Sequence, residues 1–291
     1  MNRPYVSPSP GNQKLKSCIF MPAVIAKTGR IMYSKNIYEK KGGRAVIRLY
    51  SERRVLALID GLAPTIRALA AKYPVEEAQL RAVLLREMRE IDLLDLAADA
   101  AVSFYWLRVS LRRALCRLGL ARSERPLIGG PVLGKKDSST GWAQVYGFVA
   151  VDSIIFAAER GLTTAGELGL PGGRLPERGN DGDLRTIWRR LRRDRAFNLE
   201  LCALTLLASA EERIGRADLS SPTADELKRA FTRYNGRVPG ISPYGEETYG
   251  LYLKFLEAGR STSAVSPRPR SSSSPERDIQ RREENSFDNQ K

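Results

Sequence analysis

AQLRAVLLREMREID, residues 78–92, predicts a helix that carries one carboxylate on its apolar face. Residues spaced at i, i+4, i+7 and i+11 lie on one stripe of a helix with 3.6 residues per turn. This stripe consists of Leu80, Leu84, Glu87 and Ile91, with Val83 and Met88 beside it. Every position is apolar except Glu87, so the sequence places a glutamate where a hydrophobic side chain is expected.

A glutamate on a buried stripe is costly unless it is paired or protonated. Apolar neighbours raise the pKa of such a carboxyl group, and so does the negative end of the helix dipole if the helix ends near Asp92. A carboxylic acid that keeps its proton near neutral pH can act as a general acid. The simpler interpretation is that Glu87 pairs with an arginine at the edge of the stripe, such as Arg86.

The composition narrows the possible chemistry. The chain has 291 residues, of which 42% are hydrophobic, so it can form one domain of ordinary to large size with tails, or two small domains. It has no histidine, which excludes His-dependent nucleophiles and His-ligated metals. Its cysteines, Cys18, Cys116 and Cys202, form no CxxC pair. We therefore predict no metal and no cofactor, and carboxylates as the acid–base groups of any enzyme.

The net charge of +15 favours a polyanionic partner such as nucleic acid, anionic lipid or an anionic cell-wall polymer. Basic residues gather in residues 1–54, 108–125 and 185–195, without the interleaved aromatics of a nucleic-acid motif. Residues 14–26 faintly resemble a signal peptide, so export is one possible route.

The hydrophobic patterning predicts a mainly α fold without strand-like alternation. Residues 1–48 form a basic, largely disordered arm, residues 49–258 a helical domain, and residues 259–291 a disordered Ser/Pro/Arg-rich tail. Helices are expected over residues 50–72, 78–92, 93–120, from after 144 to about 160, and over 185–195, 196–214, 221–236 and 243–256. Pro64 should break or kink the helix over residues 50–72, and a bend is expected near Asp92 to Asp95. Ser221 should be the N-cap of the helix over residues 221–236, with Pro222 at its first position.

Several polar groups allow both a structural and a functional interpretation. Asp92, Asp95 and Asp99 are either caps and arginine partners, or one of them is a second carboxylate facing Glu87. The segment DSSTGWAQ, residues 137–144, offers Ser138, Ser139 or Thr140 as a helix N-cap. Asn235-Gly236 has the composition of a helix C-cap in the left-handed conformation.

The order of these motifs resembles the lysozyme-like superfamily, and most closely its lytic transglycosylases and goose-type lysozymes. That pattern consists of a catalytic glutamate, a Gly-Leu-Met-Gln-like turn, an Asn-Ile helix start and an Ala-Tyr-Asn-Gly-like motif. Here it corresponds to Glu87, to the turn Ser139-Thr-Gly-Trp-Ala-Gln144, to Phe197-Asn198 and to Tyr234-Asn-Gly236. The resemblance covers roughly residues 75–255.

The resemblance implies a lysozyme-like helical domain and a role for each matching residue. Glu87 would be the catalytic acid and base. Ser139, Thr140, Gly141 and Gln144 would belong to the turn that floors the sugar groove, and Asn198 would open the following helix. Tyr234 and Asn235 would hold the glutamate and the substrate N-acetyl group. The sequence departs from the family pattern at Met88, which replaces a serine, and at Trp142-Ala143, which replaces Leu-Met.

The activity implied is cleavage of β-1,4 bonds in a peptidoglycan glycan strand, outside the cytoplasm, with the basic faces available to an anionic cell-wall polymer. Attack by the 6-hydroxyl group of the sugar would give an anhydro-sugar, and attack by water would give hydrolysis, with Asp92, Asp95 or Asp99 positioning the water. Two alternatives remain: a basic helical nucleic-acid-binding protein of a mobile element, and a lysozyme-like domain that binds glycans without cleaving them.

Overall fold

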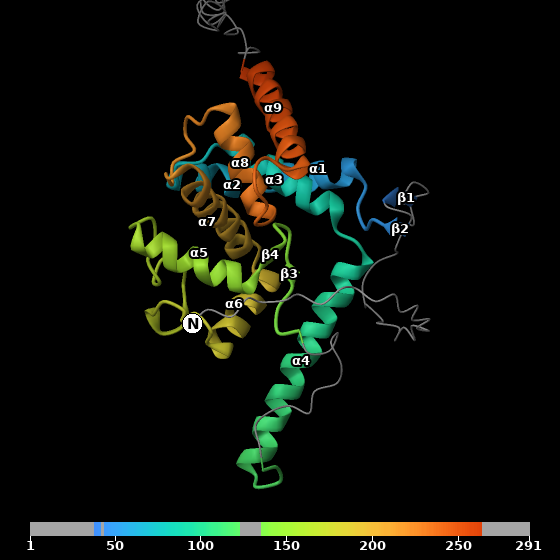
Figure 1. Ribbon diagram of the computed structural model, residues 1–291, viewed down its shortest axis with the longest axis vertical. Helices are drawn as coiled ribbons and strands as arrows, with labels where there is room; N and C mark the ends of the chain where they lie inside the picture. The colour runs from blue at the N-terminus through green and yellow to red at the C-terminus, as the bar shows by residue number, and fades with distance from the viewer. Residues whose placement is uncertain (1–37, 42–43, 123–134, 264–291) are drawn as a thin grey trace, which may run out of the picture. The chain divides into compact units, whose positions relative to one another are not determined.

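Helix α7 (Arg195–Ile214) lies at the centre of the core, because apolar side chains cover nearly all of its circumference. Phe197, Leu199, Cys202 and Leu207, on different sides of the helix, are all at most 2% exposed. A helix that is apolar all round must be enclosed by other elements. It packs against α5 (Gly147–Glu159), α6 (Asp181–Arg193) and α8 (Ala224–Asn235), and Figure 1 shows it between α5 and α8.

The computed structural model describes residues 38–41, 44–122 and 135–263, which form a mainly α fold as the sequence predicts. Most of the predicted arm, the signal-peptide-like segment, most of the loop before Asp137 and nearly all of the predicted tail lie outside these residues. Within the described ranges, no helix has the length and apolarity needed to cross a membrane.

Helix α3 (Glu77–Glu90) contains the stretch that begins at Ala78, and its predicted apolar stripe is buried. Leu80, Leu84 and Met88 are at most 1% exposed. The stripe packs against α1 (Glu52–Gly61), α2 (Ala63–Lys72) and α9 (Pro243–Ser263). Glu87 therefore sits on a face that is otherwise hydrophobic.

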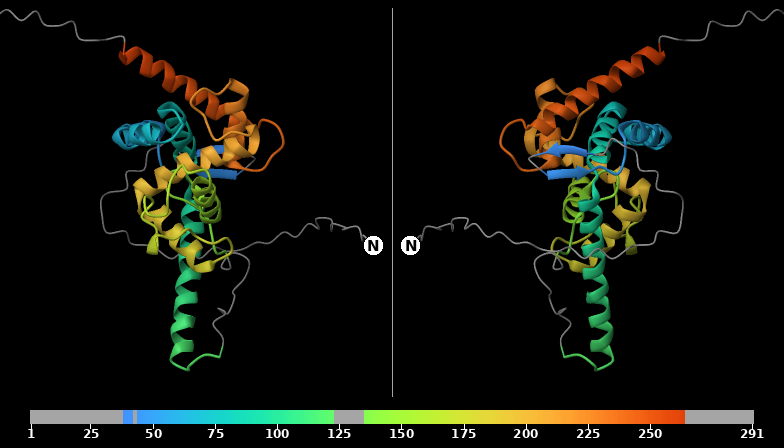
Figure 2. Two further views of the ribbon diagram at one scale, coloured as in Figure 1. Left: turned by 90° about the vertical axis from the view of Figure 1, so that its left-hand side faces the viewer. Right: turned by 90° about the vertical axis from the view of Figure 1, so that its right-hand side faces the viewer.

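The two predicted interruptions of the helices are present. Pro64 lies in the first turn of α2, where a missing N–H costs nothing, and α1 ends just before it at Gly61. Helix α3 ends because Ile91 has φ −58° and ψ 123°, and the Asp92 carboxylate then caps α4 (Leu93–Arg117) by accepting from the Leu94 and Asp95 N–H groups. Figures 1 and 2 show α4 as one long helix whose C-terminal turns extend beyond the core helices.

The structure also contains short strands, although the sequence shows no strand-like alternation. β1 (Tyr38–Lys41) pairs antiparallel with β2 (Arg44–Ile47), and β3 (Ser139–Thr140) pairs antiparallel with β4 (Val145–Tyr146). These strands have four and two residues, too few to show a clear alternation of hydrophobic and polar side chains.

The capping groups at three helix ends differ from the predicted ones. The Asp137 carboxylate, rather than a hydroxyl of residues 138–140, accepts hydrogen bonds from the Gly147 and Phe148 N–H groups at the start of α5. Thr223, rather than Ser221, is the N-cap of α8, because it forms a reciprocal capping box with the glutamate three residues later. Gly236 has φ 170°, which is extended backbone rather than a left-handed C-cap.

Candidate active site

A cavity of about 390 Å³ lies beside the C-terminal end of α3. It is bounded by the start of α4, the β3–β4 hairpin, α5, α7 and the end of α8. Seven of the predicted site residues line it: Glu87, Asp92, Asp95, Ser139, Gln144, Tyr234 and Asn235. The fold therefore joins segments up to about 150 residues apart in the chain. Four other predicted site residues do not line this cavity, namely Asp99, Thr140, Gly141 and Asn198.

Glu87 lies in the last turn of α3 and faces the cavity. Burial raises the pKa of its carboxyl group to about 7, and the negative charges of Asp95 and Glu90 act in the same direction. The hydrogen bond from Tyr244 and the charge of Arg86 oppose this rise. Both the protonated and the ionised form of this carboxyl group are thus accessible near neutral pH, which suits a group that first donates a proton and then accepts one.

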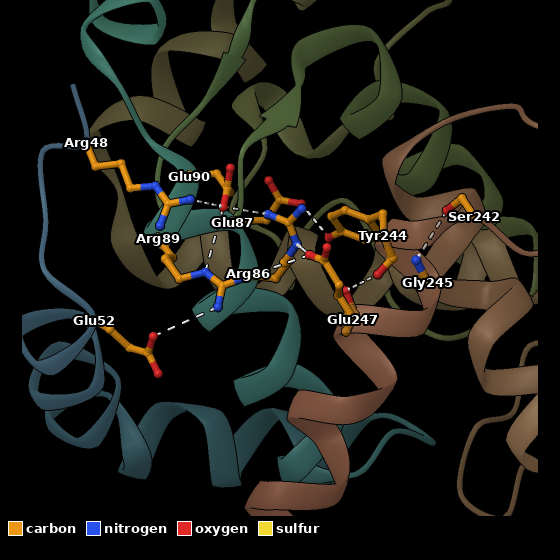
Figure 3. A network of polar contacts seen from close by, with 11 residues as sticks. Arg48, Glu52, Arg86, Glu87, Arg89, Glu90, Ser242, Tyr244, Gly245 and Glu247 are labelled. Atoms are coloured by element: carbon orange, nitrogen blue, oxygen red, sulfur yellow. Dashed lines mark hydrogen bonds and ion pairs between the residues drawn. The ribbon is translucent and has the colours of Figure 1, made fainter. Parts of the chain in front are cut away.

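Tyr244, in the first turn of α9, provides the hydrogen bond to Glu87. Its hydroxyl group donates to Glu87 Oε1 at 2.5 Å, and Figure 3 shows the two side chains pointing toward each other. The Arg86 guanidinium lies over the Tyr244 ring, 5.1 Å from its centroid. The tyrosine is consequently fixed from two sides, and it fixes one carboxylate oxygen in turn.

Arg86, the expected ion-pair partner of Glu87, pairs with other carboxylates. Its Nη1 lies 3.2 Å from Glu90 Oε1, and its Nε lies 3.0 Å from Glu247 Oε2. Arg48 also pairs with Glu90, at 3.1 Å, so the segment before α1 is tied to the end of α3 (Figure 3). These ion pairs hold the backbone around Glu87, while Glu87 itself bonds to a neutral hydroxyl group.

The turn between β3 and β4 is positioned by Asn198 and Tyr234. The Asn198 side chain accepts from the Ala143 N–H at 2.9 Å and donates to the Thr140 carbonyl at 3.3 Å. The Tyr234 hydroxyl donates to the Ala143 carbonyl at 2.7 Å. Both side chains therefore bind the turn. The resemblance implies that Tyr234 holds the glutamate, but the hydroxyl group that donates to Glu87 is that of Tyr244.

Gly141 is required for this close docking. Its φ of +74° disfavours any other residue, and a Cβ atom there would lie 2.3 Å from Asn198 Nδ2 and 2.6 Å from the Leu191 carbonyl oxygen. The turn continues to Gln144, which has φ 47° and donates from Nε2 to the Gly141 carbonyl at 2.7 Å. The conformation brings Gln144 to the cavity wall.

The three aspartates named in the sequence have different roles. Asp99 accepts hydrogen bonds from Ser138 Oγ at 2.7 Å and Thr140 Oγ1 at 2.8 Å, so it supports the hairpin from outside the cavity and does not face Glu87. Asp92 caps α4. Asp95 accepts from the Asp92 N–H at 3.0 Å and lines the cavity, and burial raises the pKa of its carboxyl group. Asp95 is thus the best placed of the three to act with Glu87.

The charged groups that line the cavity are all acidic: Glu87, Glu90, Asp92 and Asp95. No lysine or arginine is among its lining residues. Within the described part of the chain, no three acidic or cysteine side chains are grouped as a metal site. The cavity therefore suits an uncharged, hydroxyl-rich or amide-bearing ligand better than a phosphate.

Tyr244, Glu90 and Thr205 were not anticipated at the site. Tyr244 is 157 residues from Glu87 in the chain, and its neighbours in α9 give it the pattern of an ordinary core tyrosine. Thr205 lies on the buried face of α7, where it shares a hydrogen bond of 3.1 Å with Ser153 Oγ. No local spacing marks these residues as functional.

Comparisons with models of protein families, with curated proteins and with solved structures find no match. The chemistry of the cavity is accordingly inferred from its own residues. Its most informative group is a carboxyl group whose pKa is about 7, hydrogen-bonded to a buried tyrosine and open to a polar cavity.

Proposed function

We propose that this chain is a divergent lysozyme-like enzyme that cleaves β-1,4 glycosidic bonds of peptidoglycan, with Glu87 as general acid and base. The observation that carries the proposal is the raised pKa of Glu87, about 7, at the wall of a cavity. The residues that resemble the lytic transglycosylase motifs, Ser139, Gln144, Tyr234 and Asn235, line the same cavity.

In the proposed mechanism, protonated Glu87 donates its proton to the glycosidic oxygen as the bond to C1 breaks through an oxocarbenium-like transition state. The resulting carboxylate then takes a proton from the hydroxyl group that attacks C1. Tyr244 donates a hydrogen bond to Glu87 Oε1, which supports the carboxylate formed in the first step. The second oxygen of Glu87 is then the one that exchanges the proton.

The nature of the attacking hydroxyl group depends on a second carboxylate. Asp99 is bonded to Ser138 and Thr140, and Asp92 is occupied as the cap of α4, which leaves Asp95 as the candidate for positioning water. Asp95 is already bonded to the Asp92 N–H, which favours assistance by the N-acetyl group of the substrate and closure by its own 6-hydroxyl. We therefore expect anhydro-muropeptides, and we expect Asp95→Asn to keep most of the activity.

The test is mass analysis of products released from isolated peptidoglycan by wild-type protein and by Glu87→Gln. Glu77→Gln is the matched control, because Glu77 is on the same helix but pairs with Arg81 away from the cavity. We expect anhydro products from the wild type and from Glu77→Gln, with a loss of at least about a hundredfold in Glu87→Gln. Reducing-end products would show a lysozyme instead. No release by folded wild-type protein, where a control enzyme works, would contradict the proposal.

A second candidate function is binding of nucleic acid or another anionic polymer by the arginines of α4 and α6. It is favoured by the clustering of these arginines. Burial lowers the pKa of Arg185 in α6, and the positive charges of Arg189 in α6 and Arg113 in α4 lower it further. The two helices therefore bring their positive charges together. Binding to DNA that weakens steeply with salt, in a protein inactive on peptidoglycan, would support this function. Salt-insensitive binding to glycan strands without cleavage would support an inactive glycan-binding domain.

A further inference from the structure

Helix α4 carries an apolar stripe that faces solvent along its whole length. The large side chains on this stripe are exposed, with Leu107 at 62%, Leu111 at 59% and Leu118 at 71%. Its positions alternate in spacing between four and three residues, and all of them are exposed: Leu93, Ala97, Ala100, Phe104, Leu107, Leu111, Ala114 and Leu118. We call these eight residues the α4 seam.

The α4 seam is distinct from the face that attaches α4 to the core. Val102, Tyr105, Trp106 and Val109 lie on the opposite side of the helix, where they are buried in a small cluster with Trp188 of α6. The Trp106 indole donates to the Lys136 carbonyl at 3.0 Å on that same side. α4 therefore has two apolar faces, and packing among the described residues accounts for only one. An extended exposed apolar face of this kind marks an interaction surface.

The spacing of the seam specifies the kind of partner. A strict alternation of three and four is a 3.5-residue repeat, which keeps the seam in contact with a second helix in a left-handed coiled coil. The repeat spans residues 93–118, about 39 Å of helix at about 1.5 Å per residue. An interfacial lipid-binding helix has a broad apolar face. In the middle of α4 the exposed large apolar side chains, Phe104, Leu107 and Leu111, all belong to the seam, and Leu94 and Leu96 widen it only at the N-terminal end.

We propose that the partner is a second copy of this chain, whose α4 pairs antiparallel with the first through the α4 seam. In an antiparallel coiled coil centred between Phe104 and Leu107, most layers pair side chains of similar size, and one pairs an alanine with a leucine. The layers are Leu93 with Leu118, Ala97 with Ala114, Ala100 with Leu111, and Phe104 with Leu107. The small–small layer brings the helices close, and the large–large layers fill the space beside it.

The charges along α4 favour the antiparallel direction. Asp92 caps its start and its first two turns hold Asp95 and Asp99, whereas its C-terminal half holds only basic charges, among them Arg108 and Arg117. A parallel pair would align like charges, and an antiparallel pair aligns opposite ones. The flanking positions agree, because in this register Arg108 lies beside Ala101 of the second copy and Arg117 lies beside Leu96. The pairing therefore places no arginine against another at the seam.

The first experiment tests the register by disulfide cross-linking of the full-length chain, with Cys18 and Cys116 replaced by serine. An equimolar mixture of Ala97→Cys and Ala114→Cys should form a cross-linked dimer on mild oxidation, because these Cβ atoms meet in one layer. Either variant alone should remain largely uncross-linked. Efficient cross-linking of Ala97→Cys with itself would show a parallel pair and overturn the proposal.

The second experiment measures the mass in solution by light scattering and sedimentation over a range of concentrations. Leu107→Glu with Leu111→Glu should raise the dimer dissociation constant at least about a hundredfold, because four carboxylates enter the apolar layers. Leu253→Glu, at an exposed leucine of α9, is the matched control and should leave the dimer intact. Circular dichroism checks that all variants remain helical.

Other outcomes would overturn the proposal in identifiable ways. A wild-type protein that stays monomeric at all concentrations refutes pairing of two copies. If the monomer binds vesicles containing anionic lipid, and Leu107→Glu with Leu111→Glu abolishes that binding, the α4 seam is a membrane surface instead. None of these measurements depends on glycan cleavage, so they separate this inference from the proposed function.

Discussion

Replacing Glu87 by glutamine should stabilise the protein at neutral and alkaline pH but not in acid. The wild-type carboxyl group has a pKa of about 7 in the fold against 4.5 for a free glutamate, because burial disfavours its charge. The folded state therefore binds the proton more tightly than the unfolded state does. Glutamine is uncharged at every pH, has nearly the same shape, and can still accept the hydrogen bond from Tyr244.

The magnitude follows from the two pKa values. A group whose pKa is raised on folding contributes stability in full below its unfolded pKa, and this contribution is lost as the pH rises through its folded pKa. The difference of about 2.5 between the two values corresponds to about 3 kcal/mol. The free energy of unfolding of Glu87→Gln, minus that of the wild type, should thus increase by about 3 kcal/mol between about pH 4 and about pH 8.

Urea denaturation of both proteins at a series of pH values measures this difference. Tyr244→Phe provides a second check, because removing the hydrogen bond to the carboxylate should raise the Glu87 pKa further and move the pH dependence upward. The double variant Tyr244→Phe with Glu87→Gln should not show this shift, because it has no carboxyl group at position 87. A difference between Glu87→Gln and wild type that stays constant from pH 4 to pH 8 would refute the raised pKa, and with it the role of Glu87 as an acid.

Two further substitutions test the hairpin turn. Gly141→Ala should cost at least about 2 kcal/mol of unfolding free energy, because it combines a left-handed φ with a Cβ clash against Asn198, whereas Gly215→Ala, with φ +73° and open space, should cost about 1 kcal/mol. Equal losses in the two variants would show that the clash is relieved. Asn198→Ala should cost about 2 to 4 kcal/mol, because it leaves a buried N–H and carbonyl of the turn unbonded. Its control, Asn180→Ala, removes two hydrogen bonds at the exposed start of α6 and should cost only about 1 kcal/mol. Chemical denaturation measures the unfolding free energy of all these variants.

The sequence predicted the features that depend on neighbours along the chain. The 3.6-residue repeat of residues 80–91 located the buried stripe of α3 and the position of Glu87 on it. Pro64 located the break between α1 and α2, because a proline is tolerated only in the first turn of a helix. The β3–β4 hairpin escaped prediction, since two-residue strands carry no periodic signal and their stability comes from Asn198 and Tyr234.

The partners of the candidate site were decided by the tertiary structure alone. Glu87 could be assigned from its helix, but Tyr244, which donates to it, lies on α9, and nothing in the spacing of the chain pairs them. Asp95 and Asp99 look equivalent in the sequence, one turn apart on α4. The fold separates them, because the rise of one helical turn along α4 places Asp95 at the cavity and Asp99 at the hydroxyl groups of the hairpin. Local periodicity fixes which residues face inward, whereas the crossing of distant helices fixes which of them meet.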